Sequence, residues 1–238
     1  MARAMDGRFD FEAGEILLVN KPKGWSSFDV VKKLRSLFRI RKIGHAGTLD
    51  PMASGLMIII TGRKTKEMES FKSLEKEYEG VMEIGARTKS FDTETEVFER
   101  RPLDGVTEEK VRKLSGEFTG VIEQVPPMYS AVKVKGRRLY KYARTGRTVE
   151  APRRKVSISK FEPVDMHLSR ADGNPPEIRF RLVCSKGTYV RSLVEDFGQH
   201  LGCGAYLKSL VRMGVGAYRL SEALSIEDYE NLATRKAP

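Results

Sequence analysis

A single segment of the chain, reading GHAGTLDPMASGLMIIITG at Gly44–Gly62, places the strongest limit on how it can fold. Its glycines can adopt backbone angles closed to other residues, while Pro51 fixes its own φ and disfavours the helical region for Asp50. The apolar run Leu56–Thr61 is typical of a buried strand. The segment therefore predicts a rigid loop that holds one carboxylate at the start of a core strand.

Loops on rigid scaffolds often carry catalysis, so Asp50 is a candidate catalytic residue. The same residues fit a plainer interpretation, in which Asp50 caps a turn and Pro51 opens a short helix. The loop taken alone leaves both interpretations open.

The charge of the chain points to its partner. Its 238 residues include 43 Lys and Arg against 32 Asp and Glu, which gives a formal charge of +11. Such an excess favours binding to polyanions such as nucleic acid. No apolar run approaches the roughly 18 residues of a membrane span, and the first 14 residues lack the apolar core of a signal peptide. We therefore expect a cytoplasmic protein with no membrane partner.

Hydrophobic periodicity and capping signals predict a mixture of strands and helices without a regular βα alternation. Strands are expected at Ile16–Val19, Leu56–Thr61, Glu77–Ile84, Val156–Leu168 and Glu177–Cys184, and helices at Ser26–Phe38, Lys64–Ser73, Thr107–Phe118, around Leu193–Leu201 and at Ser225–Thr234. Ser26 and Asp29 approximate a capping box. The pattern predicts an α+β fold with a mixed, largely antiparallel β-sheet flanked by helices.

Several familiar site signatures are missing from the sequence. Gly62 is followed by Arg63, Lys64 and Thr65, which does not match a phosphate-binding loop, and the paired glycines near the C-terminus lack the third glycine of a dinucleotide fingerprint. The three histidines are scattered and the two cysteines form no ligand pattern. No metal and no cofactor is expected.

Four further segments change the interpretation of Asp50. They read NKPKGWSSFD at Asn20–Asp29, KEYEG at Lys76–Gly80, QVPPMYSAVKVKGRRLYKYARTG at Gln124–Gly146 and CSKGTYVRSL at Cys184–Leu193. Together with GHAGTLDPMASG, and in this order, the chain resembles the TruB family of tRNA pseudouridine synthases from about Ile16 to Arg219. The Gln124–Gly146 stretch is more similar to the stand-alone bacterial enzymes than to the RNA-guided dyskerin branch.

The resemblance implies a pseudouridine synthase catalytic fold and a cofactor-free isomerisation of the T-loop uridine at tRNA position 55. Asp50 would be the catalytic nucleophile, because a carboxylate is ionised at neutral pH and needs no base to activate it. Attack on the sugar and attack on the base are both compatible with the sequence. Arg191 matches the arginine that pairs with this aspartate, and Tyr78 the tyrosine that stacks on the target base. His45 matches the histidine that enters the T-loop where the base leaves the stack.

Without the resemblance, each of these residues has a plainer interpretation. Tyr78 would be an ordinary core aromatic of a strand, Arg191 a surface or phosphate contact, and His45 a turn residue.

Lys21 and Pro22 match a family motif that mainly supports the wall of the active site, so we expect them to be structural.

The stretch around residues 124–154 has the composition of an RNA-binding lobe, in which cations would meet phosphates and aromatic rings would stack on bases. The RNA-binding residues predicted within it are Lys133, Arg137, Arg138, Lys141 and Arg144. A solvated charged helix with its tyrosines turned toward the core is the alternative.

The organisation expected from the sequence is a flexible extension over residues 1–14, followed by one catalytic domain over residues 15–238 that includes the basic lobe. We expect no C-terminal PUA domain, although many family members carry one. The expected partner is the T-arm of tRNA, with no obligate protein partner and a monomeric state. A tRNA-binding or RNA-folding chaperone in which catalysis is secondary is the alternative function.

Overall fold

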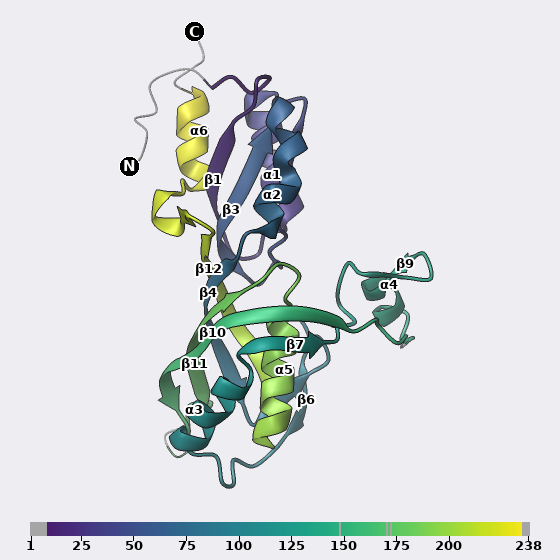
Figure 1. Cartoon of the computed structure of the whole chain (residues 1–238), viewed down its shortest axis with the longest axis vertical. Coiled ribbons are helices and arrows are strands. Elements are labelled where there is room, and N and C mark those ends of the chain that lie inside the picture. The colour runs from purple at the N-terminus through teal and green to yellow at the C-terminus, as the bar shows by residue number, and fades with distance from the viewer. Residues whose placement is uncertain (1–8, 148, 170, 172, 235–238) are drawn as a thin grey trace. The chain divides into compact units, whose positions relative to one another are not determined.

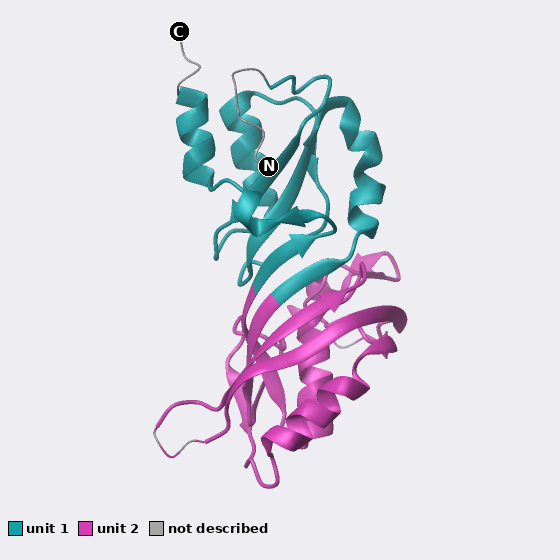
Figure 2. Cartoon of the chain, turned by 60° about the vertical axis from the view of Figure 1, so that its left-hand side comes forward, with its two compact units in different colours: residues 1–78, 211–238 teal, residues 79–210 magenta. Residues whose placement is uncertain are grey.

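The structure is a computed structural model that describes residues 9–147, 149–169, 171 and 173–234. The chain divides into two compact units, formed by residues 1–78 with 211–238 and by residues 79–210 (Figure 2). We call them unit 1 and unit 2. Two strands contribute residues to both, namely β4 (Lys76–Ile84) and β12 (Ala205–Val215).

Unit 1 is built around one buried strand. The remaining elements of this unit are β1 (Ile16–Lys21), α1 (Ser27–Phe38), β2 (Ile43–His45), β3 (Ser54–Thr61), the 3₁₀ helix η1 (Gly62–Glu67), α2 (Met68–Ser73), β13 (Tyr218–Arg219), the 3₁₀ helix η2 (Leu220–Glu222) and α6 (Ile226–Thr234). Strand β3 pairs antiparallel with β1 and β2 and parallel with β12. Every residue of β3 after Ser54 is buried, which explains its continuous apolar sequence.

Aromatic packing joins the two ends of the chain within unit 1. The Phe38 ring at the end of α1 meets the Tyr229 ring of α6 edge to face, with centroids 6.3 Å apart. The Tyr229 hydroxyl donates to the Leu18 carbonyl of β1 at 3.1 Å. Phe11 packs on Phe38 with a centroid distance of 5.2 Å. Residues 1–8 of the extension expected at the N-terminus lie outside the described residues, and Phe11 shows that its second half packs against α1.

Unit 2 contains most of the antiparallel sheet. Its remaining elements are β5 (Ala86–Thr88), β6 (Val97–Arg100), α3 (Glu108–Glu117), β7 (Gly120–Gln124), β8 (Lys133–Val134), β9 (Arg137–Arg138), α4 (Leu139–Ala143), β10 (Arg154–His167), β11 (Glu177–Cys184) and α5 (Val190–Leu201). The strand order runs β12-β4-β11-β10-β7, and β8 and β9 form a separate small hairpin (Figure 1). The predicted mixed, largely antiparallel sheet is confirmed.

The core of unit 2 is an aromatic cluster between the sheet and the helices α3 and α5. The Phe161 ring contacts those of Phe180 and Phe197 edge to face, with centroid distances of 5.5 and 5.3 Å. Gly80 makes room for this packing, because a Cβ there would lie 2.4 Å from the Phe180 ring. Packing against the Phe180 ring therefore explains why the KEYEG segment ends in a glycine.

Most element boundaries predicted from the sequence are confirmed to within a few residues. The Ser26–Asp29 capping box is present at the start of α1. The helix expected over Lys64–Ser73 is instead a 3₁₀ helix followed by the short helix α2. Strand β12 was not predicted from the sequence.

Candidate active site

Asp50 occupies a tight turn between β2 and β3. The Ala53 amide donates to the Asp50 carbonyl at 3.1 Å, and Pro51 follows the aspartate as the second residue of this turn. Pro51 opens no helix, so that part of the plainer interpretation is wrong. Gly47 and Gly55, on either side of the turn, have φ of 107° and 103°, as the glycine-rich sequence predicts. The Asp50 side chain is half-buried.

The start of helix α1 fixes the residue immediately before Asp50. The buried Ser27 hydroxyl donates to the Leu49 carbonyl at 2.9 Å and accepts from the Leu49 amide at 2.8 Å. The Gly24 amide donates to the Pro51 carbonyl at 2.7 Å. The backbone is thus held at Leu49, directly before Asp50, and at Pro51, directly after it, by the segment that precedes and opens α1.

Lys21 and Arg212 are buried cations of the same unit as Asp50. The Lys21 ammonium donates to the carbonyls of Pro22 and Trp25 at 3.0 and 2.6 Å. Burial lowers the Lys21 pKa to about 8, and Asp50 opposes this shift by stabilising the ammonium ion, while Arg212 adds to it. Arg212, on β12, is 1 % exposed. The sequence motif pointed to Lys21, whereas nothing in the sequence drew attention to Arg212.

His45 ends β2 and lies half-buried five residues before Asp50. Burial is the main cause that lowers its pKa, and the positive charges of Arg212 and Lys72 act in the same direction, while the Gly47 backbone opposes them. The imidazole is therefore neutral near pH 7. A neutral ring loses less hydration than a cation when it enters a stack of bases.

Tyr78 lies in unit 1 on the first half of β4, where side chains alternate between buried and exposed positions. It is 8 % exposed and occupies one of the buried positions. This placement fits the plain interpretation of a core aromatic and also that of a ring lining an active site, so its assigned role stays a prediction.

Arg191 lies in unit 2 near the start of α5 and is 4 % exposed. Its guanidinium forms an ion pair with Asp92, with Nη1 3.4 Å from Oδ2, and donates to the carbonyls of Ser90 and Tyr129 at 3.3 and 3.1 Å. The interpretation of Arg191 as a surface contact is wrong. A guanidinium with these partners has a single orientation.

Asp92 is the residue that sequence reasoning missed in unit 2. It is 1 % exposed, and its Oδ1 accepts from the Ser90 hydroxyl at 2.6 Å and from the Glu94 amide at 2.8 Å. The run of Ser, Asp and Thr around it predicts only a polar turn. A buried carboxylate that neutralises Arg191 can be recognised only when the two segments are seen together.

The five RNA-binding residues predicted in the lobe lie on the β8–β9 hairpin, on α4 and directly after α4, in a part of unit 2 that Figure 1 shows set off from β10 and β11. All five are exposed, namely Lys133, Arg137, Arg138, Lys141 and Arg144. The segment is a hairpin followed by a five-residue helix, so the charged helix of the alternative covers only Leu139–Ala143, and RNA binding by the five cations stays a prediction.

Tyr140 and Tyr142 of this lobe are half-buried, and each has an arginine over its ring. Arg137 lies 5.0 Å from the centroid of Tyr142, and Arg144 lies 5.5 Å from that of Tyr140. An RNA base would therefore meet a ring that already carries a guanidinium on one face.

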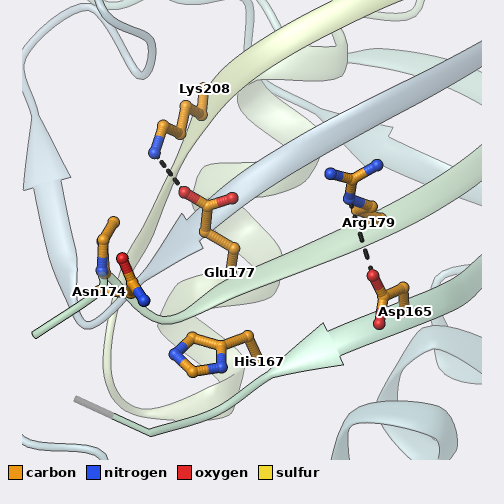
Figure 3. A pocket seen from close by; sticks show the side chains of 7 residues that line it. Asp165, His167, Asn174, Glu177, Arg179 and Lys208 are labelled. Carbon is orange, nitrogen blue, oxygen red and sulfur yellow. Dashed lines mark hydrogen bonds and ion pairs between the residues drawn. The ribbon is translucent and has the colours of Figure 1, made fainter. Parts of the chain in front are cut away.

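A separate hollow in unit 2, of about 340 Å³, lies at the end of the β10–β11 hairpin where β10 ends and β11 begins (Figure 3). Lys208 pairs there with Glu177, and Arg179 pairs with Asp165 at 3.7 Å. None of the predicted site residues lines this hollow. Among the described residues, no group of three or more His, Cys, Asp or Glu side chains could hold a metal ion.

No helix within the described part of the chain is both long enough and apolar enough to cross a membrane.

Known structures first define the class of protein. The fold is similar to that of a chain in the archaeal box H/ACA sRNP Nop10–Cbf5 complex, with a TM-score of 0.66 and 23% identity, covering 94% of this chain and 54% of that chain. A chain of a Cbf5–Nop10–Gar1 complex gives a TM-score of 0.68 at 24% identity, covering 94% and 60%. This chain thus spans a little over half the length of those solved chains, and it has the pseudouridine synthase catalytic fold.

Curated sequences then identify the family. The chain is 42% identical to a tRNA pseudouridine synthase B of Chloroherpeton thalassium over 220 residues, covering 90% of this chain and 88% of that protein. It is 44% identical to the protein of that name from Phocaeicola vulgatus over 227 residues, covering 92% and 93%. The pattern of the TruB family pseudouridylate synthase (N terminal domain) matches residues 35–190. The chain belongs to the TruB family of pseudouridylate synthases.

Proposed function

We propose that this chain is a tRNA pseudouridine synthase that isomerises the T-loop uridine at position 55, with Asp50 as the nucleophile. The observation that carries the proposal is the Asp50 turn, which is held on both sides by hydrogen bonds from the segment that precedes and opens α1, in a chain of the TruB family. The tRNA substrate is supported by the names of the relatives.

The reaction conserves its atoms and needs no oxidant or reductant. The bond between uracil N1 and ribose C1′ breaks, the base turns, and a bond between C5 and C1′ forms. The proton on C5 is lost and N1 gains one. Asp50 can attack an electron-poor carbon directly, because its carboxylate is ionised at neutral pH. It would be regenerated when the new bond is complete.

The other residues have supporting roles in this proposal. Arg191, oriented by Asp92, would pair with the Asp50 carboxylate and keep it ionised and aimed. Tyr78 would stack on the target base, and His45 would take its place in the T-loop, offsetting part of the cost of removing the base from its stack.

The basic lobe is proposed to bind the T-arm. Its five exposed cations are well placed to meet phosphates, whose neutralisation supplies most of the sequence-independent affinity for RNA. A hollow of about 420 Å³ beside the β8–β9 hairpin is lined by Lys133 and Arg153 and by Glu150.

The proposal is tested by mapping pseudouridine in one unmodified tRNA transcript before and after incubation with the protein. We expect a single new pseudouridine in the T-loop. Asp50→Asn should lower the rate by on the order of 10⁴-fold or more while RNA affinity stays within a few fold. Glu227→Gln is a matched control, because Glu227 is an exposed carboxylate of the same unit, on α6. Turnover of Asp50→Asn at the parent rate would contradict the assigned nucleophile.

The same variant separates the enzyme from the RNA-folding chaperone. A chaperone acts through RNA binding, so Asp50→Asn protein would still accelerate the refolding of a misfolded tRNA. An enzyme whose biological role is the isomerisation loses that role with the carboxylate. Complementation of a strain that lacks the modification, with the wild-type and Asp50→Asn chains compared, gives the answer.

A further inference from the structure

Arg212 connects the two sides of the Asp50 loop from a strand that is distant in sequence. Its Nε donates to the Leu56 carbonyl at 2.6 Å and its Nη2 to the Gly47 carbonyl at 3.4 Å. Gly47 lies three residues before Asp50 and Leu56 six residues after it. One planar guanidinium therefore spans the base of the loop that carries the proposed nucleophile.

The loop is shaped to admit this arginine. The backbone of Arg212 pairs in parallel register with Gly55, which has a φ of 103°. A Cβ at Gly55 would lie 2.5 Å from the Arg212 carbonyl oxygen. A Cβ at Gly47 would lie 3.7 Å from Nη1 of the Arg212 guanidinium. The two glycines of positive φ in the loop thus face the backbone and the side chain of the same residue.

Arg212 is an unusual residue for a purely structural role. It is the largest of the side chains that are less than 2 % exposed, and its hydrogen bonds among the described residues run to neutral carbonyls. Burying a cation whose hydrogen bonds run to neutral groups is unfavourable, and an apolar side chain of similar volume would fill the same space at lower cost. This cost points to a role for Arg212 other than packing.

The charge of Arg212 acts on the residues around the loop. It lowers the pKa of Lys21 and that of His45, in each case in addition to the larger effect of burial, while Asp50 acts on Lys21 in the opposite direction. A fixed positive charge in this position favours the ionised form of a nearby carboxylate.

We propose that Arg212 is a positioning residue for Asp50. The two donors of its guanidinium, Nε and Nη2, fix the carbonyls of Leu56 and Gly47, so that the turn between these residues presents the Asp50 carboxylate in one place. This inference rests on the proposed function and deepens it. Misplacement of a reacting group by about 1 Å costs on the order of 10²-fold in rate, so loss of these two donors should be visible in the chemical step.

The test uses two variants. Arg212→Met keeps the apolar stem of the side chain and removes its charge. Arg212→Lys keeps the charge and loses the paired donors of the guanidinium. Lys208→Met is the matched control, because it removes a positive charge from the same strand, where the Lys208 ammonium pairs with Glu177 and not with the Asp50 loop. Single-turnover rates are measured at saturating enzyme on a tRNA transcript. We expect the rate constant to fall about 10²-fold in Arg212→Met, to an intermediate value in Arg212→Lys, and to stay within threefold in Lys208→Met.

Single-turnover data separate positioning from folding. If Arg212 only stabilised the fold, the variants would have a smaller active fraction, which raises the total enzyme concentration needed for saturation and leaves the saturated rate constant at the wild-type value. That result, or an equal rate constant in Arg212→Met, would overturn the inference. A wild-type chain that forms no pseudouridine would instead reject the proposed function, and this inference with it.

A titration of the histidines gives a second readout. Removal of the Arg212 charge should raise the pKa of His45 in Arg212→Met, while Arg212→Lys and Lys208→Met should leave it at the wild-type value. The His45 signal is identified among the three histidines by its loss in His45→Gln. An unchanged His45 pKa in folded Arg212→Met would place the guanidinium outside the electrostatic reach of the loop and count against the proposal.

Discussion

Buried charges are the main residue-scale feature of unit 1. Lys21, Lys76 and Arg212 are all at most 6 % exposed. Lys21 and Lys76 donate to backbone carbonyls of neighbouring turns, and Arg212 donates to those of the Asp50 loop. A buried ammonium or guanidinium costs free energy of folding even when hydrogen-bonded. In unit 1 this cost in folding free energy arises from residues around the proposed nucleophile.

Lys21 makes this cost measurable as a function of pH. Its pKa is lowered to about 8 in the folded chain, from 10.5 in the unfolded chain. Between these values the unfolded chain binds a proton that the folded chain does not, so Lys21 makes the stability of the wild type rise with pH. Below about pH 8 both states carry the charge and the effect is constant.

We therefore expect the stability of the wild type, relative to Lys21→Met, to increase between about pH 8 and 10.5, by up to about 1.4 kcal/mol per pH unit. Urea unfolding of both chains at pH 7, 8.5 and 10 measures the difference, and common titrations of other groups cancel. A difference that stays constant across these three pH values would show that Lys21 keeps its ordinary pKa.

At the scale of elements, the N-terminus of α1 combines two neighbouring serines with different tasks. Ser26 caps the helix from a half-buried position, with its hydroxyl accepting from the Asp29 amide. Ser27 is buried, and its hydroxyl donates to the carbonyl and accepts from the amide of Leu49, the residue before Asp50. The helix is thus capped by one residue and attached to the loop by the next.

Ser26→Ala and Ser27→Ala should separate these tasks. Loss of the cap should lower the free energy of unfolding by about 0.5–2 kcal/mol with little effect on the rate of isomerisation. Ser27→Ala leaves the amide and carbonyl of Leu49 buried without this partner, at a cost of about 1–3 kcal/mol each, and should also slow catalysis. Urea unfolding and single-turnover kinetics on both variants check this. Equal rates in the two variants would mean that Leu49 does not help to place Asp50.

At the scale of the whole molecule, the formal charge of +11 governs the encounter with RNA. Exposed cations release counterions from the phosphates that they neutralise, so the logarithm of the affinity falls linearly with the logarithm of the salt concentration. The chemical step that follows binding releases no further counterions. Salt should therefore lower kcat/KM strongly and leave the single-turnover rate at saturating enzyme nearly unchanged.

Arg138 is the sharpest probe of this behaviour, because Arg137 is already engaged with the Lys141 carbonyl and the Tyr142 ring. Arg138→Ala should reduce the salt slope of RNA binding by about 0.7–0.9 for one phosphate contact. Lys160→Ala is the control, since Lys160 is an exposed cation of β10 paired with Glu162. Fluorescence anisotropy at four salt concentrations gives the slopes. An Arg138→Ala slope equal to that of the control would place Arg138 away from the RNA.

Sequence patterns identified the elements whose signal is local. The capping box at Ser26 and Asp29 and the apolar run of β3 each follow from residues close together in the chain. The same is true of the Asp50 turn, where Pro51 and two glycines restrict the backbone. The lobe over 133–147 was identified as basic, but its division into a hairpin and a short helix was not predicted, because charged residues fit either structure.

The sequence by itself therefore determined the fold class, the family and the local geometry around Asp50, all of which depend on short-range patterns and on ordered motifs. Only the tertiary structure decided that Arg212 reaches the carbonyls of Gly47 and Leu56, and that Asp92 neutralises Arg191. The physical reason is the same in both cases. A buried charge is stabilised by partners that are distant along the chain, and no pattern of neighbouring residues records which segments will meet.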